Sequence, residues 1–302
     1  MRSFRIYIDS SCDLSTEYIN ENNITVIPMM YSLDDKDHPD GRWRDISGDN
    51  FYKALKNGGV AKTTQVNPGT FAEYFGECAA QGEDLICITL SSGLSGSYNN
   101  AVSAAEDVSN HYPDRGIYVI DSINATGGHG LLAALAVDKG GEGLSAKDTA
   151  KWLNERKHSV YAVFTVDDLN FLHRGGRLSK LSAVAGSLLS VKPLLWVTPD
   201  GHLQLKDKVR GRKAALETLL SQMKRCINPG DNPGLVIITH CGCEDDANKL
   251  ADLIKESYNG ASTMVVTMGP VIGAHTGPGA VAMFFESNMT REEYDKKYYS
   301  KN

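Results

Sequence analysis

Small polar side chains follow three predicted strands in the first half of the chain. These polar segments lie at 9–13, 91–97 and 121–128, after strands predicted at 4–8, 85–90 and 117–120. Ligands of open α/β sheets bind beyond the carboxyl ends of the strands, so we expect the three segments to line one crevice. Their hydroxyls, and the free N–H groups where helices begin, favour an anion. In the alternative interpretation, each Ser or Asp only caps a helix.

The serine-rich segment does not match the patterns of common catalytic or nucleotide sites. Residues 93–97 read GLSGS, with serine at position 97 where the nucleophile elbow G-x-S-x-G requires glycine. The phosphate-binding pattern G-x-x-x-x-G-K-[ST] does not occur. The run GPGAVA at 277–282 fits G-x-G-x-x-A, but it contains a proline and precedes a predicted strand instead of a helix. A serine hydrolase and a dinucleotide site are both disfavoured.

A histidine near the C-terminus lies on an unusual stretch of backbone. His275 stands in GPVIGAHTGPG at 269–279, among four glycines and two prolines. Glycine allows a backbone to approach a ligand closely, so we expect His275 to contact a ligand. The alternative is a histidine with a structural role.

Two basic patches could contact phosphate or an acidic partner. One contains Arg174 and Arg177, in a segment expected to open a helix, and the other contains Arg210 and Arg212, after a predicted strand. Arginine is well suited to phosphate and carboxylate groups. A solvated basic rim is the alternative for each patch.

Composition excludes several classes of protein. The 302 residues carry 31 Lys+Arg against 37 Asp+Glu, a net charge of -6, which disfavours nucleic acid as a partner. The longest apolar run, 131–137, is far shorter than the roughly 20 residues that span a bilayer. The N-terminus shows no signal peptide, and the six scattered cysteines suit a reducing cytoplasm. His240-Cys241-Gly242-Cys243 has no second Cys/His pair, so no metal is predicted.

The order of predicted elements indicates a two-domain α/β protein. Short apolar runs alternate with amphipathic stretches, which predicts a mainly parallel sheet in an N-terminal domain at 1–158, with a small polar excursion at 32–47. The turn Pro199-Asp200-Gly201 predicts a hairpin, so the C-terminal domain at 159–302 is expected to be α+β with a mixed sheet. Further strands are predicted at 24–30, 160–166, 193–197, 203–209, 235–239, 262–267 and 280–285, and helices at 68–80, 94–111, 128–139, 145–157, 213–226 and 245–258, with a helical passage through 188. Each domain is long enough to bury its own core, which predicts a monomer.

These segments together resemble the DegV family, the fatty-acid-binding proteins also called FakB. The resemblance runs from Phe4 to about Glu286, and rests on seven ordered segments: DSSCD at 9–13, KTTQ at 62–65, SSGLSGSY at 91–98, RGGRLS at 174–179, KP at 192–193, VRGRK at 209–213 and GAHTGPG at 273–279. It implies a DegV-like (EDD) fold with a long-chain fatty acid between the two domains.

The resemblance also implies a set of site residues. The family holds the carboxylate with a hydroxyl of a T-S-Q-P motif, a serine of the S-G-L-S-G loop and the histidine before G-x-G; these positions match Thr63, Ser95 and His275. A supporting pocket is then expected from Thr64, Ser92, Gly93, Gly96, Asp9 and Ser10. This chain departs from the motif at Val66, where the family commonly has proline. The resemblance therefore does not predict the backbone conformation after Gln65.

A carrier function follows from the resemblance. The protein is expected to bind a fatty acid such as palmitate and present its carboxylate to a partner fatty acid kinase, without catalysis and without a cofactor. Arg174, Arg177, Arg210 and Arg212 would face that partner or its phosphate. Each buried CH₂ contributes about 0.8 kcal/mol, so the tail supplies most of the affinity. The alternatives are a phosphotransferase related to the dihydroxyacetone kinases, and a serine esterase acting through Ser95 and His275.

Overall fold

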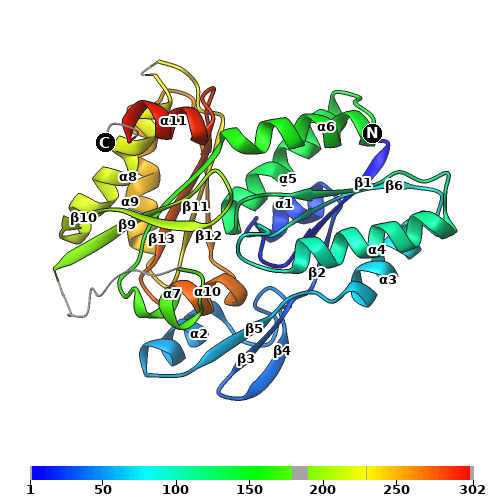
Figure 1. The fold of residues 1–302 in the computed structure, drawn as a ribbon. Helices are drawn as coiled ribbons and strands as arrows, with labels where there is room; N and C mark the ends of the chain where they lie inside the picture. Colours follow the sequence, from blue (N-terminus) through cyan, green and yellow to red (C-terminus); the bar gives the residue numbers. More distant parts are fainter. Residues whose placement is uncertain (1, 179–189, 229, 300–302) are drawn as a thin grey trace.

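The computed structural model describes residues 2–178, 190–228 and 230–299, which form three sheets (Figure 1). The first sheet has the order β2-β1-β6-β7, and its neighbouring strands pair in parallel. Its strands are β1 (Phe4–Asp9), β2 (Ile24–Ile27), β6 (Asp84–Thr89) and β7 (Ile117–Asp121). The parallel sheet predicted for the first half is therefore confirmed.

Helices cover both faces of this sheet. Leu85 and Cys87 of β6 pack with α3 and α4 on one face, while Ile86 and Ile88 pack with α5 and α6 on the other. These helices are α3 (Pro68–Ala80), α4 (Ser97–His111), α5 (Thr126–Gly141) and α6 (Ala146–Arg156); a short α1 (Thr16–Glu21) follows β1. A strand buried on both faces has no polar side, which explains the continuous apolar runs in the sequence.

The second sheet is mixed and has the order β10-β9-β8-β13-β11-β12. Its strands are β8 (Val160–Thr165), β9 (Val191–Val197), β10 (Leu203–Arg210), β11 (Leu235–His240), β12 (Ser262–Thr267) and β13 (Val281–Glu286). β9 and β10 form the predicted antiparallel hairpin, and β11 and β12 pair in parallel. α8 (Arg212–Cys226), α9 (Glu244–Ser257) and α11 (Arg291–Tyr298) pack on one face. The predicted α/β fold with a mixed second sheet is confirmed.

Helix α5 lies between the two large sheets. Each half has a core of its own, and a third cluster joins Ile6 and Ile8 of β1 to Ile237 and Phe284 of the second sheet through α5. The halves therefore share part of their core, in addition to the separate cores that the chain length predicts. The chain crosses between them through a 3₁₀ turn at Lys157–Ser159, and the division at 158 into separate domains stays a prediction.

A buried arginine also connects the halves. The Nη1 group of Arg291 donates to the carbonyls of Thr198 at 2.8 Å and Ile123 at 3.2 Å. Burial lowers the pKa of this guanidinium to about 10. Arg291 thereby ties the β9–β10 turn to the end of β7.

A third, smaller sheet corrects the prediction for residues 24–47. The predicted strand at 24–30 ends at Ile27, and β3 (Met30–Leu33) pairs antiparallel with β4 (Lys36–Pro39) and β5 (Ala61–Thr64). The polar excursion at 32–47 is thus partly a hairpin, whose turn places Asp34 and Asp35 at positive φ. With α2 (Gly48–Lys56), this sheet lies beside α10 (Pro270–Thr276) in Figure 1.

Of two short helices near the His275 segment, α10 was not predicted, and the other falls within the helical passage predicted from the strand at 160–166 through 188. His275 lies on α10, because the run PVIGAHT forms two helical turns with proline at the first position. Arg174 ends α7 (Asn170–Arg174), where the sequence suggested the start of a helix. The part of that helical passage beyond residue 178 lies outside the described residues.

The contact of α5 with the second sheet depends on glycine. A Cβ atom on Gly127 would lie 2.5 Å from the Phe284 ring and 2.7 Å from Ile237 Cγ2. We expect Gly127→Ala to lower the free energy of unfolding by about 1–3 kcal/mol, because overpacking forces the helix away from the sheet. Denaturant unfolding measures this change.

The matched control lies at the other end of the same helix. A Cβ atom on Gly141 would meet nothing within 4 Å. Gly141→Ala should leave stability unchanged or raise it by up to about 1 kcal/mol. Equal effects of the two substitutions would contradict the proposed role of the Gly127 contact.

Candidate functional site

The three polar strand ends of the first sheet do come together, joined by two carboxylates. Asp9 Oδ2 accepts from the Leu90 N–H at 2.7 Å, which joins the ends of β1 and β6. Asp121 Oδ1 accepts from the Ser92 N–H at 3.1 Å, which joins β7 to the same loop. Asp9 is fully buried. These two aspartates hold the loop that carries Ser95 in place.

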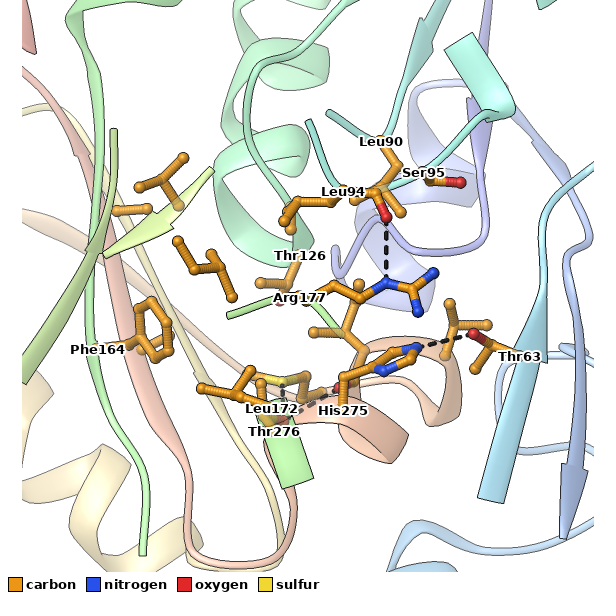
Figure 2. A pocket seen from close by; sticks show the side chains of 18 of the residues that line it. Thr63, Leu90, Leu94, Ser95, Thr126, Phe164, Leu172, Arg177, His275 and Thr276 are labelled. Atoms are coloured by element: carbon orange, nitrogen blue, oxygen red, sulfur yellow. Dashed lines mark hydrogen bonds between the residues drawn. The ribbon is translucent and has the colours of Figure 1, made fainter. Parts of the chain in front are cut away.

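A cavity of about 370 Å³ lies beyond these strand ends, between them, α10 and the inner face of the second sheet (Figure 2). Most of its wall is apolar. The apolar lining includes Met29, Leu90, Leu94, Ala125, Ala162, Phe164, Leu172, Val197, Leu203, Met268, Val271, Ile272, Ala282 and Phe284. Its volume falls within the range of about 300–1,000 Å³ that small-molecule sites occupy.

Three of the predicted site residues line one end of this cavity. Thr63 comes from β5, Ser95 from the loop between β6 and α4, and His275 from α10. Thr63 Oγ1 and His275 Nε2 are 2.8 Å apart and hydrogen-bonded. Figure 2 shows this pair on the side of the cavity opposite Phe164. Ser95 Oγ lies 3.1 Å from Ser97 Oγ and accepts from the Ser97 N–H.

The expected supporting residues divide into two groups. Thr64 lines the cavity with Thr63 and Gln65, whereas Ser92, Gly93, Gly96, Asp9 and Ser10 stand outside its lining. Gly93 and Gly96 allow close packing behind the site. A Cβ atom on Gly96 would lie 2.3 Å from Gln65 Oε1, and one on Gly93 would lie 2.9 Å from the Gly201 carbonyl oxygen.

Burial determines the charge state of His275. Removal from solvent, reinforced by the charge of Arg177, lowers the pKa of its imidazole to about 4. Its Nδ1 atom has no hydrogen-bond partner among the described residues. A Cβ atom on Gly175 would lie 2.2 Å from that Nδ1, so glycine is needed there for the ring to fit. The imidazole is neutral at neutral pH and can donate through only one nitrogen.

The four predicted arginines have different environments. Arg177 lines the cavity, and its Nε donates to the Leu94 carbonyl at 3.2 Å across the polar end. Arg212 is engaged in ion pairs with Asp246 at 2.8 Å and Asp167 at 3.3 Å. Arg174 and Arg210 are exposed. Contact of Arg174 and Arg210 with a partner stays a prediction, and these two arginines are the exposed ones of the four.

Several lining residues were missed by the sequence analysis. Gln65 adds a polar group to the wall, and Arg177 is part of the cavity instead of an outer surface, whereas Thr126 belongs to the segment 121–128 that was expected there. Side chains of a strand point alternately to its two faces, and this alternation could have indicated part of the apolar wall. Ala162 and Phe164 of β8 share one face, as do Ala282 and Phe284 of β13.

The part of the chain that the structure describes contains no cluster of three or more His, Cys, Asp or Glu side chains able to hold a metal ion. Within the same residues, every helix is too short or too polar to cross a bilayer.

The fold and cavity define an α/β protein with a largely apolar ligand pocket between two sheets. Residues 3–288 match the DegV family model, and the chain belongs to that family. It is 36% identical over 286 residues to a DegV domain-containing protein of Clostridium perfringens, covering 94% of this chain and 98% of that one. Among solved structures, a DegV lipid binding protein of Thermotoga maritima is 30% identical, with a TM-score of 0.84 and coverage of 96% and 100%. A second Thermotoga maritima protein, with a reported fatty acid binding function, is also 30% identical, with a TM-score of 0.82 and coverage of 95% and 100%.

The neutral state of His275 can be tested directly by NMR. With ¹³C-labelled histidine, we expect the His275 signals to stay those of a neutral ring from about pH 8 down to about pH 5, because its pKa lies near 4. The spectrum of His275→Gln assigns the signals.

A titration midpoint near the ordinary value of about 6.5 would contradict the buried, neutral state. The lowered pKa of His275 also determines the direction in which stability depends on pH. Since the unfolded chain binds the proton at higher pH than the folded one, this group makes stability fall as the pH drops from about 6.5 to about 4.

Proposed function

We propose that this protein binds a long-chain free fatty acid, with the tail in the cavity and the carboxylate at Thr63, Ser95 and His275. The observation that carries the proposal is the polarity of the cavity, which is apolar along most of its wall and ends in two hydroxyls and a neutral imidazole. The lipid and fatty acid binding of the two Thermotoga maritima relatives supports it.

Exposure along the cavity indicates the direction in which a fatty acid lies. Thr64 and Gln65, beside the polar end, are exposed, whereas Ala162, Phe164 and Phe284 are buried. A carboxylate at the exposed end keeps contact with water and polar groups, and the tail leaves water. Burial of a tail of about 16 carbons contributes on the order of 10 kcal/mol before the entropic costs of binding.

The Thr63–His275 pair can prepare a donor for the carboxylate. If His275 donates its single proton from Nε2 to Thr63 Oγ1, the threonine hydroxyl hydrogen is free to donate to the ligand. Hydrogen bonds to a charged acceptor are among the stronger ones. Arg177, at the same end of the cavity, adds a positive charge without replacing these donors.

The exposure of the polar end of the cavity also supports presentation of a bound carboxylate to a partner fatty acid kinase. The sequence contains no phosphate-binding loop of the Walker type, so a separate protein would supply the nucleotide. The exposed Arg174 and Arg210 offer positive charge for docking. In this proposal the protein is a carrier and the kinase performs the chemistry.

The esterase alternative has little support from the geometry. His275 Nε2 bonds to Thr63, and the hydrogen bonds of Ser95 Oγ within the described residues involve Ser97, so serine and histidine do not form a nucleophile–base pair. Turnover of ATP by the purified protein with an empty cavity would favour the phosphotransferase alternative.

Retained ligand tests the binding proposal. The purified protein is denatured and extracted, and mass spectrometry should find a long-chain acid. We expect Ser95→Ala with His275→Ala to weaken palmitate binding at least tenfold, because the double variant removes the Ser95 donor and the histidine that frees the Thr63 hydroxyl to donate. A hydrogen bond to a charged group is worth about 1.5–3 kcal/mol. Ala162→Phe should reduce binding as well, by filling the buried part of the cavity.

Ser103→Ala, on the exposed side of α4, is the control and should bind palmitate normally. Normal palmitate retention in both the double variant and Ala162→Phe would place the ligand elsewhere.

Charge reversal tests presentation to the kinase. Arg210→Glu and Arg174→Glu should leave palmitate binding unchanged and slow acyl phosphate formation by a cognate kinase several-fold, because charges at the rim of an interface mainly affect association. Lys151→Glu makes the same charge change at an exposed position of α6 and is the control. Unchanged acyl phosphate formation in both arginine variants would refute this docking surface.

A further inference from the structure

One peptide group of the second half is held from both sides by buried side chains of the first half. The Gly269 N–H donates to Asp13 Oδ1 at 2.8 Å, and the Tyr52 hydroxyl donates to the carbonyl oxygen of Met268. That carbonyl and that N–H belong to the same peptide bond. Asp13, Tyr52 and Met268 are all nearly inaccessible to solvent, so water cannot replace these hydrogen bonds.

This peptide is the entrance to α10. Gly269 is the residue that caps the helix, and its carbonyl accepts the hydrogen bond from the Gly273 N–H at 2.8 Å. The helix then contributes Val271, Ile272 and His275 to the cavity wall, and Met268 lines the cavity as well. The orientation of one peptide plane therefore influences both the polar end of the cavity and part of its apolar wall.

Helix α10 packs closely on Asp13 and Tyr52 at its first two glycines, Gly269 and Gly273. A Cβ atom on Gly269 would lie 3.0 Å from Asp13 Oδ1, and one on Gly273 would lie 2.3 Å from the Tyr52 hydroxyl oxygen. The absence of side chains at these two positions lets the helix rest directly on the residues that hold it.

The buried Asp13 carboxyl is costly to maintain. Its Oδ2 has no hydrogen-bond partner among the described residues, and it lies with Asp40 and Arg42 on a small cavity of about 240 Å³. Burial raises the pKa of Asp13 to about 7. An apolar residue would avoid this cost, but it could not accept the Gly269 N–H.

We propose that Asp13 and Tyr52 are positioning residues for the fatty acid site, which act through the Met268–Gly269 peptide to set the place of α10 and its His275. This inference rests on the proposed function for the ligand, but the place of His275 can be measured without any ligand. Asp13 and Tyr52 do not line the fatty acid cavity themselves.

The test compares Asp13→Ala, Asp13→Asn and Tyr52→Phe in the full chain. Asparagine keeps an oxygen that accepts the Gly269 N–H, whereas alanine removes it. We expect Asp13→Ala and Tyr52→Phe to shift the NMR signals of the His275 ring and to weaken palmitate binding about tenfold. Asp13→Asn should restore both to within about threefold of the unchanged protein.

Asp40→Asn is the matched control. Asp40 is a second buried carboxyl on the same small cavity, and its Oδ1 accepts from the Arg42 N–H instead of from α10. This variant should leave the His275 signals in place.

The outcomes separate the two proposals. Unshifted His275 signals in folded Asp13→Ala and Tyr52→Phe, or equal shifts in Asp13→Asn and Asp13→Ala, would overturn the positioning role. If His275 shifts as expected while the unchanged protein binds no palmitate, the positioning role stands and the ligand assignment fails. Tyr52→Phe keeps the ring in the core, so it remains informative if Asp13→Ala does not fold.

Discussion

The close packing of the start of α5 against the second sheet is the contact on which the rest of the structure depends. Gly127 and Gly128 bring the helix backbone onto Phe284, and the helix at the same time covers β1 and β6 of the first sheet. One helix therefore serves as an inner layer for both sheets. Their separation is set by the thickness of a helix that lacks side chains at its closest point of contact.

The cavity lies where this inner layer ends. Ala125 and Thr126, at the first turn of α5, form part of its wall, and the space beyond them is enclosed by β8, β13 and α10. Thr126 has a φ of 46°, which is strained for a β-branched residue, and its hydroxyl donates to Thr239 Oγ1 at 3.1 Å. Such strain persists only where surrounding contacts enforce it, and here it marks the junction between the inner helix and the cavity.

The sequence predicts the elements better than it predicts the environment of the site. Apolar runs located the strands of both large sheets, and Asn67 with Pro68 located the start of α3, because these signals are local. The small sheet was missed because the strand at 24–30 divides after Ile27, where Pro28 breaks the apolar run that predicted a single strand. The approach of Arg177 to the cavity and the burial of Asp13 depend on residues far away in the chain. Glycines at 269 and 273 were visible, but the groups they approach, Asp13 and Tyr52, were not.

The polar end of the cavity is formed by three residues from well-separated parts of the chain, Thr63, Ser95 and His275. During synthesis, the last of them appears only after most of the 302 residues have been made. A ligand that contacts all three recognises the assembled protein and neither half alone. By mass action, binding of such a ligand increases the population of complete molecules over partly folded ones. A product truncated before α10 lacks His275, and it therefore cannot form the complete polar end of the cavity.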